Sequence, residues 1–179
     1  SSREESQSAT RDVLKILEPP ETHKLRPNVS VKLSQIGLVI DEELCRENLR
    51  TLLEKAQQTR SYIRIDMEDS TLTTATIDTY LWARNAGYEN VGIVLQSYLY
   101  RTAKDIENLM NFNTRVRLCK GAYKEPASVA FPEKAKVDEN FDRLVDQLFD
   151  ASQKWGYPPI SADGRVPSIP GIATHDPVR

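Results

Sequence analysis

Short apolar runs alternate with amphipathic stretches along most of the chain. Segments of strand length with apolar or alternating residues recur at 29–34, 62–69, 91–96, 115–120 and 171–176. Between them, apolar residues at helical spacing predict helices at about 41–58, 72–86, 102–110 and 134–154. No two strands are joined by a hairpin signal. The pattern therefore predicts an α/β fold with about five parallel strands and helices outside the sheet.

Three of the predicted helices have apolar stripes, with side chains recurring three or four positions apart on one face. In 41–58 the stripe is Cys45, Leu49, Leu52, Leu53 and Ala56. In 72–86, which we expect to stop at Gly87, it is Leu72, Ile77, Tyr80 and Leu81. In 134–154 it is Val137, Phe141, Leu144, Val145 and Leu148. Residues 155–170 are rich in Pro, Gly and Ser, and we expect a loop there.

The N-terminal residues 1–10 are polar, and we expect them to be frayed. A short helix should follow, with Thr10 as its N-cap and Pro19-Pro20 as its stop. Residues 1–28 thus form a polar N-terminal segment in this interpretation. Residues 29–179 form the α/β domain.

Polar side chains lie at or near the carboxyl end of every predicted strand. They are Lys32, Asp66, Gln96, Arg117 with Lys120, and Thr174 with His175. Ligands of parallel α/β folds bind at that edge of the sheet. Neither a dinucleotide-binding glycine fingerprint nor a Walker lysine loop follows any strand. A (β/α) barrel therefore fits better than a doubly wound nucleotide-binding fold, although five strands do not close an eight-stranded barrel.

Each of these residues has an alternative interpretation. Lys32 in an apolar strand needs a partner or a ligand, unless it reaches solvent. Gln96 could offer a hydrogen-bond donor and an acceptor to a heteroaromatic ring. Alternatively, it could be a core amide whose hydrogen bonds are made within the protein. Arg117 alternates with Val116 and Leu118 and could meet an anionic or electron-rich group, or point to solvent from an edge strand. His175 at a strand end suits phosphate contact, but a lone histidine is more often structural.

A metal site is the less favoured interpretation of the acidic run after the second strand. Asp66 and Glu68 share one face and Asp69 lies on the other, so at most two carboxylates converge. An ion pair between one of them and Lys32 or Arg117 is the preferred alternative.

Composition and charge exclude several classes of protein. The chain has 179 residues, 28% charged and 39% apolar, with a formal net charge of −2. It is therefore globular and lacks the basic footprint of a nucleic-acid-binding protein. Its apolar runs are shorter than a membrane span, and residues 1–12 have no signal-peptide core. We expect a cytoplasmic protein, with peripheral contact at the inner face of the membrane left open, and two buried reduced thiols, Cys45 and Cys119.

Five strings of residues, taken in order, resemble the proline dehydrogenase (proline oxidase) family. They are Val31-Lys32-Leu33-Ser34, Ile65-Asp66-Met67-Glu68-Asp69, Val94-Leu95-Gln96-Ser97-Tyr98-Leu99-Tyr100-Arg101, Arg117-Leu118-Cys119-Lys120-Gly121-Ala122-Tyr123 and Ala173-Thr174-His175-Asp176. The resemblance covers about residues 29–179. It implies a distorted (β/α)8 TIM-type barrel that binds FAD non-covalently. It also implies oxidation of L-proline to Δ1-pyrroline-5-carboxylate, with electrons passing to a membrane quinone.

The resemblance also implies roles for single residues. Asp66 would fix the substrate pocket, and Arg117 would hydrogen-bond flavin N5. Lys32 would help hold the proline carboxylate, and Tyr123 would pack by the ring and the substrate. The other implied flavin contacts are Met67, Gln96, Lys120, Gly121, Ala122, Thr174 and His175, and no metal is implied. A cation at N5 would stabilise the negative charge that a hydride brings to the ring.

By the same resemblance, the chain holds strands two to six of the barrel, and an arginine pair that clamps the substrate carboxylate lies beyond it. We therefore expect a piece of a longer protein, with free strand edges at 29–34 and 171–175, poorly stable and inactive alone. The insert at 155–170 is longer than the family pattern. Two alternatives from other classes remain open. They are a non-catalytic half-barrel that binds a partner, and a metal-dependent lyase or aldolase that uses Asp66, Glu68 and Lys32.

Overall fold

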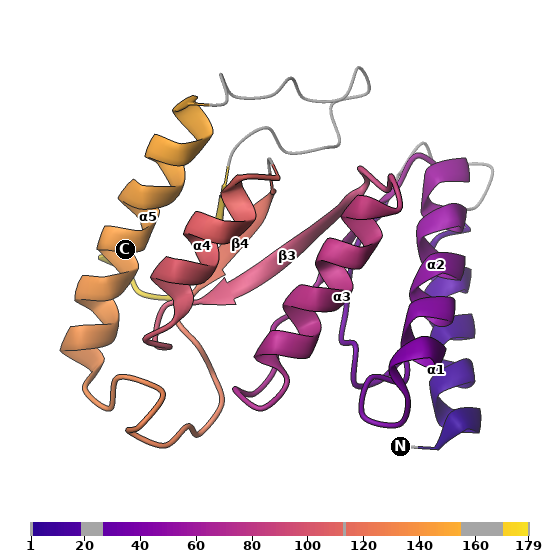
Figure 1. Ribbon diagram of the computed structural model, residues 1–179, viewed down its shortest axis with the longest axis horizontal. Coiled ribbons are helices and arrows are strands. Elements are labelled where there is room, and N and C mark those ends of the chain that lie inside the picture. The colour runs from indigo at the N-terminus through magenta and orange to yellow at the C-terminus, as the bar shows by residue number, and fades with distance from the viewer. Residues whose placement is uncertain (1, 19–26, 113, 155–169, 179) are drawn as a thin grey trace. The chain divides into compact units, whose positions relative to one another are not determined.

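The computed structural model describes residues 2–18, 27–112, 114–154 and 170–178. Its strands and helices alternate, which confirms the predicted α/β class (Figure 1). The chain forms two compact units, one of Ser1–Asp66 with Thr74–Gly92 and one of Met67–Thr73 with Ile93–Arg179. The expected loop at 155–170 lies outside the described residues, except for Pro170.

The first unit contains α1 (Arg3–Ile16), β1 (Asn28–Val31), α2 (Glu42–Gln58), β2 (Tyr62–Ile65) and α3 (Thr73–Asn85). Strands β1 and β2 pair in parallel, and Asn28 lies opposite Tyr62. Helices α1 and α2 lie side by side (Figure 1). The predicted stripe of α2 is buried along its whole length, together with the apolar side chains of β2. Of the stripe predicted for 72–86, Ile77 and Tyr80 are buried, whereas Leu81 and Leu72, which directly precedes α3, are only half-buried.

The second unit contains β3 (Val91–Gln96) from Ile93 onward, α4 (Thr102–Met110), β4 (Val116–Cys119), α5 (Lys134–Lys154) and β5 (Gly171–Ile172). Strands β3, β4 and β5 pair in parallel in chain order. Helix α5 packs on α4 and on β4 (Figure 1). It buries Phe141, Leu144 and Leu148. Every residue of β3 is buried, as expected for a strand covered on both faces.

The predicted frayed N-terminus and the predicted cap at Thr10 are both wrong, because the first helix begins at Arg3. Ser2 and Glu5 form a capping box, in which the Glu5 amide donates to Ser2 Oγ at 3.2 Å and the Ser2 amide donates to Glu5 Oε2 at 2.7 Å. Thr10 lies inside the helix, where its buried hydroxyl donates to the Ser6 carbonyl. The two hydrogen bonds at Ser2 thus fix the N-cap of the helix eight residues before the predicted cap at Thr10.

The predicted strands are longer than the observed ones wherever a turn follows. Strand β1 ends at Val31 and β2 at Ile65. After Val31 the backbone makes local bonds, from the Gln35 amide to the Lys32 carbonyl and from the Ile36 amide to the Leu33 carbonyl. The alternating pattern through Lys32-Leu33-Ser34 therefore continues past the end of the ladder. Helices α2, α4 and α5 and strand β3 match their predicted bounds within a residue.

Neither cysteine forms a disulfide, and only Cys45 is buried. Cys119 is half-buried and shares a face of β4 with Arg117, opposite the buried Val116 and Leu118, so its expected burial is wrong. Among the described residues, none of the helices combines the length and the apolarity that crossing a bilayer requires.

Candidate functional site

In the first unit, Lys32 and Asp66 directly follow the neighbouring strands β1 and β2. The last register pair is Val31 with Ile65, and the Asp66 amide donates to the Val31 carbonyl at 2.9 Å. This bond places the backbone of Asp66 beside the end of β1, and Lys32 is the next residue after that end. Lys32 is exposed, so the expectation that it is held inside an apolar strand is wrong; it lies in the turn just after that strand.

In the second unit, Gln96 and Arg117 lie on the same face of β3 and β4. Arg117 is paired with Val94, and Gln96 is paired with Cys119 two positions further along. On the other side Arg117 is opposite Gly171 of β5, where a Cβ would lie 3.4 Å from Arg117 Cγ. The half-buried Arg117 thus extends from a strand that is paired on both sides, and not from an edge. The edge-strand alternative for Arg117 is therefore wrong, and its interpretation as a ligand-facing cation stays a prediction.

The side chain of Gln96 is almost fully buried, with 3% of its surface exposed. Its Nε2 donates to the Met67 carbonyl at 3.3 Å, which brings Met67 to the end of β3. Its Oε1 is also buried and has no hydrogen-bond partner among the described residues. A buried acceptor without a donor costs free energy. The Oε1 atom therefore suits an N–H or O–H group of a bound molecule.

The turn after β4 is built around Tyr98. Gly121 has φ +121°, and a Cβ there would lie 2.5 Å from Cδ1 of the Tyr98 ring. The sequence suggested that Gly121 lets the backbone approach a ligand. In the structure the space beside Gly121 is taken by the ring of Tyr98, which is 8% exposed and whose amide donates to the Lys120 carbonyl.

Glu125 connects this turn to the segment after β2. Ser70 donates its amide to Oε1 at 2.7 Å and its hydroxyl to Oε2 at 2.5 Å. The Tyr98 hydroxyl donates to Oε1 at 3.5 Å. Burial, and then the Glu125 charge, raise the pKa of the Tyr98 phenol, so it stays a donor at neutral pH. Nothing in the sequence pattern singles out Ser70, and the signal for Glu125 is a carboxylate two positions after Tyr123.

Lys120 lies in a cluster of two cations and two carboxylates. Its Nζ lies 2.6 Å from Asp138 and 2.6 Å from Asp176, and Lys134 contacts the same two carboxylates at 2.5 and 3.2 Å. Bonds to these carboxylates raise the pKa of Lys120 and of Lys134. Bonds from Lys120 lower the pKa of Asp138 and, most strongly, of Asp176. The charge of Lys120 is thus already balanced by protein groups.

The same cluster anchors the segment after β5. Asp176 follows the exposed His175, and the Asp176 amide donates to Thr174 Oγ1 at 3.0 Å. The Val178 amide in turn donates to Asp176 Oδ1. Lys120 and Lys134 therefore hold, through Asp176, the loop that presents Thr174 and His175. Of the other predicted residues, Tyr123 is half-buried and Ala122 is exposed.

Replacing Asp176 by Asn should reduce the acid sensitivity of the fold. The folded-state pKa of Asp176 is lowered, so its contribution to stability is present above the unfolded pKa of about 3.9 and is lost as the pH falls below it. The free energy of unfolding, measured with urea at several pH values between about 2 and 6, should fall less steeply in Asp176→Asn than in the wild type. Asp78→Asn, at an exposed position of α3, is the control. Equal slopes in all three proteins would contradict the prediction.

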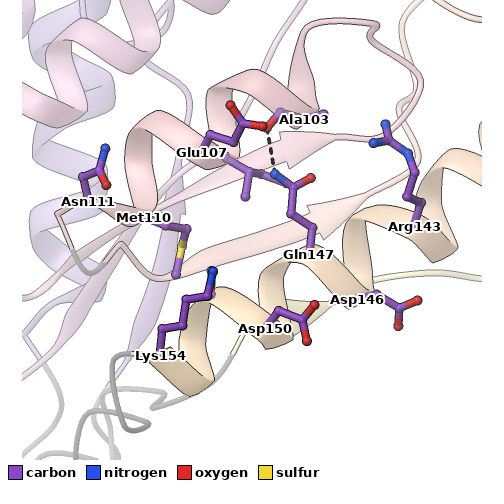
Figure 2. Close-up of a pocket in the computed structure, with 11 residues that line it drawn as sticks. Ala103, Glu107, Met110, Asn111, Arg143, Asp146, Gln147, Asp150 and Lys154 are labelled. Atoms are coloured by element: carbon purple, nitrogen blue, oxygen red, sulfur yellow. Dashed lines mark hydrogen bonds between the residues drawn. The ribbon is translucent and has the colours of Figure 1, made fainter.

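Two further arrangements bear on other kinds of site. Within the described ranges, no three His, Cys, Asp or Glu side chains lie close enough together to hold a metal ion. A groove of about 650 Å³ lies between α4 and α5, where Gln147 Nε2 donates to the Ala103 carbonyl at 2.9 Å (Figure 2). Its walls combine apolar Ile106 and Met110 with charged Glu107 and Arg143, and none of the predicted site residues lines it.

Comparison with known proteins gives consistent matches. A family model described as proline dehydrogenase matches residues 2–177. Proline dehydrogenase 2 of Bacillus subtilis (strain 168) is 40% identical over 144 residues, which are 80% of this chain and 47% of that protein. Proline dehydrogenase of Deinococcus radiodurans is 42% identical over 144 residues, 78% of this chain and 46% of that protein. The chain thus spans about half the length of these curated relatives.

Solved structures show the same fold. Proline utilization A from Bdellovibrio bacteriovorus, inactivated by N-propargylglycine, superposes with a TM-score of 0.73 over 85% of this chain and 20% of that chain, at 21% identity. A variant of proline utilization A from Bradyrhizobium japonicum gives 0.72 over 84% and 19%, at 19% identity. At this identity the likeness concerns the fold alone. It confirms the predicted class, part of a (β/α)8 barrel.

Proposed function

The chain belongs to the proline dehydrogenase family, and we propose that in the whole protein it supplies part of the site that oxidises L-proline to Δ1-pyrroline-5-carboxylate with bound FAD. The family is flavin-dependent. Bound FAD would supply the acceptor for the hydride that leaves proline. Transfer of the electrons to a quinone, with contact at the membrane surface, is part of the same proposal.

The observation that carries this proposal is the buried Gln96 Oε1, an acceptor without a partner among the described residues, beside Arg117 on the same sheet face. A flavin ring has N–H and carbonyl groups at its edge, so an amide and a guanidinium suit it. Residues that fit the group are thus present at the carboxyl end of β3 and on the neighbouring strand β4. Met67, held by Gln96, lies there too.

In this proposal Arg117 keeps a positive charge where negative charge develops during the reaction. Asp66 and Lys32 shape and orient the substrate, since a cation beside its carboxylate restricts how proline lies. Tyr123 closes the pocket by packing. The remaining cofactor contacts are assigned to Lys120, Gly121, Ala122, Thr174 and His175.

The Lys120 cluster refines one of these assignments. Its ammonium is bonded to Asp138 and Asp176, so we assign its side chain to holding the 173–178 loop in place. A cofactor contact from Lys120 is then made by its backbone. Thr174 and His175 supply the polar groups at the end of β5.

The direct test is to purify the whole protein and add L-proline without oxygen. Flavin absorbance in the purified protein, bleached by L-proline, is the expected result; D-proline is the matched control. Protein that is colourless and does not bind added FAD would contradict the proposal and favour a non-catalytic, partner-binding half-barrel. Metal analysis of the same sample tests the lyase alternative, for which the described residues offer no ligand cluster.

Replacing Lys32 by Ala should weaken proline binding more than it changes the flavin. Loss of one charge-assisted hydrogen bond costs about 1.5–3 kcal/mol, so the apparent Kd for proline should rise about 10- to 150-fold. The flavin spectrum should stay close to that of the wild type. Lys136→Ala, at an exposed position of α5, is the control. Lost flavin with an unchanged response to proline would reassign Lys32 to the cofactor or the fold.

A further inference from the structure

One carboxylate holds two segments that both carry proposed site residues. Glu125 accepts two hydrogen bonds from Ser70, at 2.7 and 2.5 Å, and one from the Tyr98 hydroxyl at 3.5 Å. Ser70 is in the segment Met67–Thr73, and Glu125 is 55 residues further along the chain. An amide and a hydroxyl of one residue on the two oxygens of one carboxylate fix direction as well as distance.

The segment Met67–Thr73 is held at a second point as well. The Met67 carbonyl accepts from the buried Gln96 Nε2 at 3.3 Å. Met67 is 5% exposed, and Asp66 immediately precedes it. The segment is therefore tied at Met67 to β3 and at Ser70 to Glu125. The second tie limits how the backbone between Met67 and Ser70 can move.

The other partner is the turn Gly121–Tyr123, which ends two residues before Glu125. The Tyr98 ring fills the space beside Gly121, and the Tyr98 amide donates to the Lys120 carbonyl at 2.9 Å. The Tyr123 backbone also hydrogen-bonds to the Tyr98 phenol. Tyr98 thus contacts this turn along its length while its hydroxyl donates to Glu125.

We propose that Glu125 is a positioning residue, whose bonds to Ser70 and Tyr98 set the placement of Met67–Thr73 against the turn Gly121–Tyr123. The inference rests on the proposed function, because Met67 and Tyr123 are its proposed flavin and substrate contacts. Glu125 itself touches neither flavin nor proline in this proposal. Its effect is on how tightly both are bound.

The test uses the whole protein with Glu125→Gln, Ser70→Ala and the double variant. Each single change should raise the Kd for FAD and the KM for proline about tenfold, with kcat changed less, because a charge-assisted bond is lost. The double variant should be no worse than the worse single variant, since both changes remove the same bond. Amide exchange of residues 67–73 should accelerate in Glu125→Gln. Glu47→Gln, at an exposed position of α2, should match the wild type.

Three results would overturn the positioning role. They are unchanged exchange at 67–73, single variants whose Kd and KM stay within twofold of Glu47→Gln, and additive effects in the double variant. If Glu125→Gln does not fold, Ser70→Ala decides, because it removes only a hydroxyl. Wild-type protein that binds no flavin would overturn the proposed function as a whole, whereas normal flavin binding with unaffected variants overturns the positioning role alone.

Discussion

Replacing Arg117 by Met is expected to slow the reduction of bound flavin by proline about 10²- to 10³-fold. Arg117 lies between β3 and β5 on the face that carries Gln96, and we propose that its charge stabilises the negative charge that builds up in the transition state. Removing one such donor costs about 2.7–4 kcal/mol in other enzymes. Met keeps the apolar stem and removes only the charged group, so folding should be nearly unchanged.

Anaerobic stopped-flow absorbance measures this effect directly, since it separates flavin reduction from later electron transfer. Arg115→Met is the matched control, because Arg115 precedes β4 on the same face, about 7 Å nearer the amino end of the strand. It should leave the rate within a few-fold of the wild type. An unchanged rate in Arg117→Met, or equal losses in both variants, would remove Arg117 from the mechanism.

Long amphipathic helices were the most predictable part of the fold. In α2 the apolar stripe and the Asp41 cap, whose side chain accepts from the Leu44 amide at 2.8 Å, point to the same boundary. In α5 the apolar stripe is so long that only one face of the helix can be the buried face. Strand ends were less predictable, because a period of two continues into turns such as Lys32-Leu33-Ser34. Strand pairing ends where the neighbouring strand ends. The sequence of one strand does not show where that is.

The candidate site likewise has a part that the sequence predicts and a part that it does not. Strand order alone predicts that polar residues at carboxyl ends share one edge, and Gln96 and Arg117 do share a face. Contacts between distant residues could not be predicted. From the sequence, Lys120 is expected to be a cation that binds a ligand. In the structure its ammonium is bonded to Asp176, 56 residues away. Glu125 and Ser70 look like ordinary loop residues until the fold brings them together.

Replacing Gly121 by Ala is expected to be among the most destabilising single-methyl changes in this chain. At φ +121° any Cβ adds backbone strain of about 1–3 kcal/mol. The added methyl would also lie 2.5 Å from the Tyr98 ring, and such overpacking costs about 1–3 kcal/mol more. The free energy of unfolding, measured with urea, should therefore fall by about 2–6 kcal/mol.

Gly87→Ala is the matched control, because Gly87 also has positive φ, +91°, but nothing lies within 4 Å of its Cβ position. It should cost only the backbone strain, about 1–3 kcal/mol. In a Tyr98→Ala background the Gly121→Ala change should shrink to a similar cost, because the ring that the methyl meets is gone. If Gly121→Ala costs no more than Gly87→Ala, the close contact with Tyr98 is wrong. If its excess cost persists without the ring, another neighbour of Gly121 is responsible, and a bound ligand's contact with this turn would be the next candidate to test.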